Sequence, residues 1–134
     1  MIVADTNLVA YLLIEGERTA AAEAVYARDP VWLSPLLWRS EIRNVLAFHV
    51  HREHFSLEHA VALVDRAEEL IGGRDYAVES SDVLRLAAES GCSAYDCEFV
   101  ALARTLDLPL VTADRSLLRA FPGVAVGFEE WAQG

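Results

Sequence analysis

The sequence predicts an α/β fold with three layers, α/β/α, and a central parallel sheet of four to five strands. Short apolar runs recur along the chain, and a helical pattern separates each run from the next, as in folds whose strands pair in parallel. The runs are continuously apolar rather than alternating, which indicates a sheet covered by helices on both faces. With 134 residues, 54% of them hydrophobic, we expect one folded domain over residues 1–134.

The first half of the chain contains two of these strands and three helices. Thr6 or Asn7 is placed to cap the first helix, because small polar side chains accept hydrogen bonds from the free N–H groups of a first turn. Pro35 is placed to open the third helix, since a first-turn position needs no N–H group. The predicted elements are strand Ile2–Asp5, helix Thr6–Leu13, helix 18–28, strand Val31–Ser34 and a helix from Pro35 to about Glu53.

The second half alternates in the same way. Gly72 and Gly91 each end a helix, because glycine readily adopts the left-handed conformation that follows one. Ser81 or Asp82 is placed to cap the helix that ends at Gly91. The predicted elements are helix Ser56–Leu70, strand Tyr76–Glu79, a short helix up to Gly91, helix Tyr95–Leu106, strand Pro109–Thr112, helix Asp114–Ala120, strand Val124–Val126 and a tail with Phe128 and Trp131.

The charge balance limits how the chain can bind a ligand. It has 21 acidic and 11 basic residues, a formal net charge of −10, the reverse of a protein that holds nucleic acid by phosphate contacts alone. A polyanionic substrate would therefore need metal ions. All basic residues are arginines, which excludes lysine chemistry such as Schiff bases and P-loops.

Three observations bear on the compartment. Cys92 and Cys97 are too few for a disulfide framework and are interpreted as reduced thiols. No uncharged stretch approaches the length of a membrane span. The N-terminus has no basic region of the kind that begins a signal peptide. We expect a cytoplasmic protein with no membrane contact.

Two carboxylates follow predicted strands. Asp5 ends the first strand, and Asp114 comes just after the strand Pro109–Thr112, so both should project at the carboxyl edge of the sheet, where ligands bind in such folds. Each also suits a helix N-cap, a purely structural role.

Glu41 lies on the wrong face of its predicted helix. At about 100° per residue it falls inside a continuous apolar arc, whereas Arg39 and Arg43 lie opposite. An unpaired carboxylate on a packing face is costly unless something neutralises it; a salt bridge to a core-facing arginine is the structural alternative. The arc consists of Leu37, Phe48, Val45, Trp38, Ile42 and Leu46.

Asp96 repeats this anomaly on the next long helix. It lies between Ala103 and Val100 on the helical wheel, within an apolar arc, while Glu98 points elsewhere and is interpreted as an ordinary surface charge. A contact with the helix dipole in the first turn is its structural alternative. The arc consists of Leu102, Tyr95, Leu106, Phe99, Ala103 and Val100.

Together, four carboxylates from four segments are expected in one cleft. Like charges raise each other's pKa unless a cation joins them, and hard oxygen ligands suit Mg²⁺ or Mn²⁺. The chemistry that follows is metal-assisted hydrolysis of a phosphodiester bond.

Four motifs containing these acids occur in order: Val3 to Asn7, Ser40 to Leu46, Ala94 to Ala103 and Leu110 to Asp114. Together they resemble the PIN domain over essentially the whole chain, and their order and spacing resemble the VapC-type toxins of type II toxin–antitoxin pairs. The resemblance implies a PIN-like fold and a Mg²⁺- or Mn²⁺-dependent endoribonuclease that cuts RNA. It also implies a homodimer, in some cases a dimer of dimers, and a VapB-type antitoxin that blocks the site.

The resemblance implies a role for individual residues. Asp5, Glu41, Asp96 and Asp114 match the metal-binding, catalytic acids. Candidates for holding substrate or water are Thr6, Asn7, Asn44, Thr112, Ser116, Arg39 and Arg43. After Asp114 the chain has Arg115-Ser116-Leu117 where some PIN domains have a further acidic or amide residue, which leaves open whether one metal or two bind.

Other patterns are given less weight. The four histidines match no zinc signature, and Trp32 and Trp38 are expected in a core rather than stacked on RNA. A receiver-like signalling domain would need a lysine, and a dehalogenase-like phosphatase would need an Asp where Asn7 stands. A catalytically inactive PIN-like binding or scaffold module is the remaining alternative.

Overall fold

The computed structural model describes residues 1–134 and contains one five-stranded parallel sheet in the order β3-β2-β1-β4-β5. The predicted fold class is confirmed. The central strand β1 pairs with β2 through Ile2 opposite Trp32 and with β4 through Val3 opposite Leu110. The strands are β1 (Ile2–Ala4), β2 (Trp32–Pro35), β3 (Asp75–Tyr76), β4 (Leu110–Val111) and β5 (Ala125–Val126).

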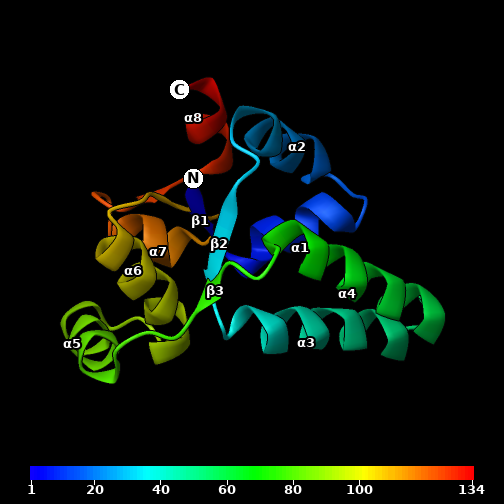
Figure 1. Ribbon diagram of the computed structural model, residues 1–134, viewed down its shortest axis with the longest axis horizontal. Coiled ribbons are helices and arrows are strands. Elements are labelled where there is room, and N and C mark those ends of the chain that lie inside the picture. Colours follow the sequence, from blue (N-terminus) through cyan, green and yellow to red (C-terminus); the bar gives the residue numbers. More distant parts are fainter.

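Helices cover both faces of this sheet. Figure 1 shows α1, α3 and α4 on one side of the strands and α5, α6 and α7 on the other, with α8 beside α2 at the top. Helix α6 contacts β1 and β2, and α4 contacts β2 from the opposite layer. The helices are α1 (Thr6–Leu13), α2 (Thr19–Arg28), α3 (Trp38–His51), α4 (Leu57–Ile71), α5 (Ser80–Ser90), α6 (Ala94–Leu106), α7 (Arg115–Ala120) and α8 (Phe128–Gln133). None of them is long and apolar enough to cross a bilayer.

The core lies between the sheet and its two helix layers. All three residues of β1 are fully buried, as are the rings of Trp32, Trp38, Phe99 and Phe128. The core interpretation of both tryptophans is therefore confirmed. Cys92 and Cys97 are both free, as expected.

Pro35 does not open a helix; it ends β2. Ser34 N–H and Leu36 N–H donate to the carbonyls of Arg74 and Tyr76, so the residue between them occupies a position where β3 needs no N–H donor. Pro35 is also the last residue of β2 and lies beyond the Cα pairs that join β2 to β1, so β1 needs no N–H from it either, and α3 starts only at Trp38.

Helix α1 starts at Thr6 as predicted, but the caps predicted for two helices differ from those observed. Asp5, rather than Thr6 or Asn7, caps α1. Glu79 precedes α5 without a side-chain cap, so neither Ser81 nor Asp82 has that role. The tail that begins at Phe128 forms a further helix, α8, and β3 is shorter than predicted and ends at Tyr76.

The strand order reverses beside β1, because β2 and β3 extend to one side and β4 and β5 to the other. Ligands of open α/β sheets bind beyond the carboxyl ends of the strands at such a reversal. Asp5, after β1, and the segment after β4 therefore lie at the position where this topology places a site.

Candidate active site

Asp5 is a buried carboxylate at the end of the central strand, with 7% of its surface exposed. The Thr6 N–H donates to its Oδ1 at 2.8 Å, and the Thr112 hydroxyl donates to its Oδ2 at 2.6 Å. Burial raises its pKa to about 7; the two hydrogen bonds oppose this rise, and the charges of Glu41 and Asp96 add to it. Asp5 therefore lies where a negative charge is costly unless a cation balances it.

Glu41 faces Asp5 from the first turn of α3. Its Oε1 accepts a hydrogen bond from the Thr6 hydroxyl at 2.8 Å, so Thr6 connects the first turns of α1 and α3. Burial raises the pKa of Glu41, and the charges of Asp96 and Glu98 raise it further, against the Thr6 hydrogen bond.

The arc predicted around Glu41 is present in part. Trp38, Ile42 and Leu46 are buried, whereas Phe48 is 49% exposed. Phe48 lies near the end of α3, where Arg52 rather than the core covers its ring, with the guanidinium carbon 4.4 Å from the ring centroid.

Asp96 reaches the same region from the first turn of α6. Ser93 Oγ caps this helix by accepting from the Asp96 N–H at 3.0 Å. Burial raises the pKa of Asp96, and the charge of Asp114 raises it further. The arc predicted on this helix is wrong at its two ends, because Tyr95 is 65% and Leu106 40% exposed.

Asp114 is the N-cap of α7. Its Oδ1 accepts from the N–H groups of Ser116 and Leu117 at 2.8 and 3.1 Å. The capping role expected for Asp114 is thus present, as it is for Asp5, and it does not remove either acid from the cluster. A cap engages one carboxylate oxygen here and leaves Asp114 Oδ2 free to bind.

Thr112 and Asn7 join the strand ends. The Thr112 hydroxyl, besides donating to Asp5, accepts from the Asp114 N–H at 2.9 Å. Asn7 Nδ2 donates to Asp5 Oδ2 at 3.3 Å, and Asn7 Oδ1 accepts from the Ala113 N–H at 3.3 Å. These bonds hold the loop after β4 against the start of α1.

No positive side chain neutralises this cluster. None of the four acids forms an ion pair within 4.0 Å, which rules out the salt-bridge alternative for Glu41. As the side chains lie, no three Asp, Glu, His or Cys residues surround one point closely enough to hold a metal. The donor set nevertheless fits a divalent cation in its chemistry, since it consists of hard oxygen ligands whose charge is unbalanced.

The remaining predicted residues lie around the cluster or away from it. Asn44 and Ser116 are exposed. Arg39 is not a free cation: its Nε donates to Asp75 Oδ2 at 2.6 Å, and its Nη1 contacts Glu68 at 3.3 Å. Arg43 is exposed and lines an apolar groove between α3 and α4.

Glu98 is the acid that the helical wheel misplaced. It is half-buried, burial raises its pKa, and its charge acts on Glu41. The signal that could have found it is the uninterrupted buried run from Phe99 to Ala103, because a helix covered on several sides has no wholly solvated face.

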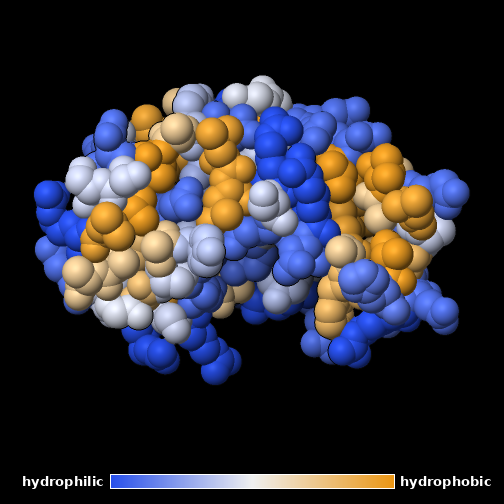
Figure 2. Space-filling model, turned by 90° about the horizontal axis from the view of Figure 1, so that it is seen from below, coloured by the Kyte–Doolittle hydropathy of each residue, from blue (hydrophilic) through white to orange (hydrophobic).

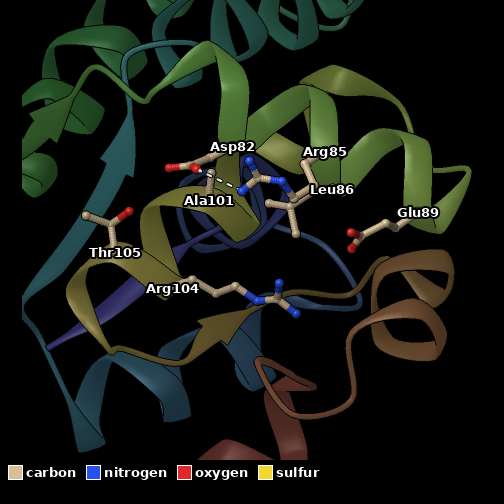
Figure 3. A pocket seen from close by; sticks show the side chains of 7 residues that line it. All are labelled: Asp82, Arg85, Leu86, Glu89, Ala101, Arg104 and Thr105. Carbon is tan, nitrogen blue, oxygen red and sulfur yellow. Dashed lines mark ion pairs between the residues drawn. The ribbon is translucent and has the colours of Figure 1, made fainter.

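The surface over the carboxyl ends of the strands has two apolar areas with a hydrophilic band between them (Figure 2). The pocket of Figure 3, between α5 and α6, lies outside the acid cluster and is lined by none of the four acids. In it Arg85 pairs with Asp82 at 3.7 Å, so the charge of Arg85 is already compensated.

Comparison with known proteins shows a family and similar proteins. The PIN domain family model matches residues 2–121. Ribonuclease VapC3 of Pyrobaculum aerophilum is 28% identical over 126 residues, which cover 92% of this chain and 96% of that protein. The crystal structure of PAE2754 from Pyrobaculum aerophilum aligns with a TM-score of 0.77 and 20% identity over 98% of this chain and 86% of that one, a likeness of fold.

Proposed function

The chain belongs to the PIN domain family, and from that membership we propose that it is a Mg²⁺- or Mn²⁺-dependent endoribonuclease, the toxin of a VapBC-type pair. The observation that carries the proposal is the group of Asp5, Glu41, Asp96 and Asp114, which come from four segments and have no ion-pair partner. Burial raises the pKa of each of the first three, and the negative charges of the neighbouring acids raise it further. Such a group is unfavourable by itself and favourable around a divalent cation.

These four acids would hold the metal. Asp5 is fixed by its hydrogen bonds. Glu41 and Asp114 are each held through one carboxylate oxygen and keep the other for the ion, and Asp96 is partly exposed. When bound, the metal supplies a water of lowered pKa and a positive charge for the leaving oxygen. The residues of this chain orient the acids: Thr6 holds Glu41, and Thr112 holds both Asp5 and the Asp114 backbone.

The proposals for the substrate and for the partner rest on the name of one relative. The name Ribonuclease VapC3 supports RNA as substrate and a VapB-type antitoxin as partner, and we propose a homodimer in the cytoplasm, where that RNA is present. The metal also resolves the electrostatic conflict between a chain of net charge −10 and a polyanionic substrate.

The test is cleavage of total cellular RNA by the purified, antitoxin-free protein in Mg²⁺, Mn²⁺ or EDTA. Asp5→Asn protein prepared in the same way is the control, since it keeps the side-chain shape and loses the charge. We expect discrete fragments that require metal and are absent with the variant. No cleavage by folded protein in either metal would favour the inactive binding module instead.

A further inference from the structure

Most arginines of this chain are engaged with other side chains. Seven of the eleven pair with a carboxylate, donate to a backbone carbonyl or stack on a ring: Arg18, Arg28, Arg39, Arg52, Arg74, Arg85 and Arg104. The four without such a contact are Arg43, Arg66, Arg115 and Arg119. These four guanidinium groups are therefore available to bind an anionic ligand.

Arg119 is the unpaired arginine that shares a pocket with the acid cluster. It lines a polar cavity of about 500 Å³ between the α5–α6 loop, the start of α6 and α7, and Asp96 forms part of the same wall. Arg119 and Ser116 lie three residues apart on α7 and so share one helix face. The cavity therefore opens directly beside the proposed metal site.

One further polar group of this cavity is a free hydrogen-bond donor. The Ser93 hydroxyl is already engaged, because its Oγ accepts from the Asp96 N–H and its side chain hydrogen-bonds the Asp96 carboxylate. Ser116 uses its backbone N–H on Asp114, and its hydroxyl has no partner within the chain. With the guanidinium of Arg119, the cavity offers two unused donor groups and one positive charge, which suits an anion rich in acceptor oxygens.

We propose that Arg119, with Ser116, binds the backbone phosphate next to the scissile one, which makes this cavity a substrate subsite and Arg119 a positioning residue. The proposal rests on the proposed ribonuclease function. Asp96 belongs to both the acid cluster and the cavity wall, so an RNA whose scissile phosphate lies at the cluster has a neighbouring phosphate within reach of Arg119. The subsite holds the strand in register, and the acids act on the bond.

The first experiment measures binding rather than activity. In an Asp5→Asn background, which blocks cleavage, a fluorescein-labelled single-stranded RNA of mixed sequence is titrated in Mg²⁺ at several salt concentrations. We expect Arg119→Ala to weaken binding about three- to tenfold and to reduce the slope of log K against log salt by about 0.7, the value for one phosphate contact on a single strand. Arg119→Lys should retain most of the slope, since it retains the charge.

The matched control is Arg115→Ala. Arg115 is exposed on the same short helix and does not line the cavity, so its loss changes the net charge by the same amount. Equal weakening by Arg115→Ala and Arg119→Ala would mean a diffuse charge effect and would overturn the subsite.

The second experiment locates the contact. In a short RNA that spans a cleavage site found in the total-RNA digest, each phosphate near the cut is replaced in turn by an uncharged methylphosphonate. With wild-type protein, replacement of the phosphate at one neighbouring position should raise KM with little change in kcat. This is the result expected when a contact that binds substrate and transition state equally is lost. In Arg119→Ala that same replacement should have no further effect.

The outcomes separate the two proposals. Cleavage by wild-type protein with unchanged affinity and salt slope in Arg119→Ala overturns the subsite and leaves the ribonuclease standing. A methylphosphonate effect that is equal in wild type and Arg119→Ala does the same. Folded wild-type protein that neither cleaves nor binds RNA overturns the ribonuclease, and the subsite with it.

Discussion

The Thr112 hydroxyl donates to Asp5 Oδ2 at 2.6 Å across 107 residues of sequence. This bond joins the ends of β1 and β4, the two strands between which the sheet reverses its order. It lowers the pKa of Asp5, but burial outweighs it and brings that pKa to about 7. Asp5 therefore accepts hydrogen bonds that favour its charged form, and its ionisation still costs free energy because the carboxylate is buried.

This balance predicts a pH-dependent stability in EDTA. The folded state keeps a proton on Asp5 up to about pH 7, whereas the unfolded chain loses it near 3.8. Stability should therefore fall as the pH rises through that window, by at most about 1.4 kcal/mol per pH unit for this one proton. Urea unfolding from pH 5 to 8 measures it. Asp5→Asn should flatten the profile, and parallel curves for the two proteins would contradict the assignment.

Glu41→Gln and Asp96→Asn are each expected to abolish RNA cleavage, by about a thousandfold or more, because each removes a proposed metal ligand. The fold should remain intact or gain stability, since one repelling charge is lost. Glu98→Gln is the comparison: Glu98 acts on Glu41 through its charge, so its loss should change the rate less than about tenfold. Single-turnover cleavage and thermal melting measure both effects; a variant that unfolds, or cuts at the wild-type rate, would argue against this site.

Asp75 should contribute to the free energy of unfolding and not to RNA affinity. Burial acts to raise its pKa, and hydrogen bonds from Arg39 Nε and Trp38 Nε1 outweigh burial and lower it. We expect Asp75→Ala to cost about 1.5 kcal/mol of unfolding free energy, since both donors lose a charged acceptor. Arg39→Ala should also destabilise while leaving RNA affinity unchanged, measured by urea unfolding and by anisotropy. A loss of affinity in folded Arg39→Ala would restore Arg39 as an RNA contact.

Phe128 packs α8 against the core of the protein. Its ring is fully buried, 6.0 Å in an edge-on geometry from Tyr11, with Arg18 over it at 4.8 Å. Phe128→Ala should cost about 3–4 kcal/mol, the range for removing a buried aromatic ring. Phe48→Ala is the control, because Phe48 is 49% exposed and should cost less than about 1 kcal/mol. Similar losses from both would mean that α8 adds little to the core.

The sequence was sufficient to predict the sheet and to select the four candidate acids. It was not sufficient to predict which side chains contact one another. Continuous apolar strands and carboxylates on apolar arcs are local patterns, so Asp5, Glu41, Asp96 and Asp114 could be identified from them. A helical wheel gives the direction of a side chain but not its partner. It placed Arg39 opposite the apolar arc and could not show that Asp75 of β3 pairs with it. Helix α8 was missed because its six residues are too short to show a period, and it is held by burial of Phe128.

The position of β1 determines when this centre can form during translation. Asp5 is made almost at once, but its partner Thr112 and the neighbouring Asp114 are made 107 and more residues later, and one edge of β1 stays unpaired until β4 emerges. A ribosome-bound fragment that stops before β4 therefore carries three of the acids without their arrangement. The four acids can therefore take up the arrangement of the folded protein only after β4 and the following turn have been synthesised.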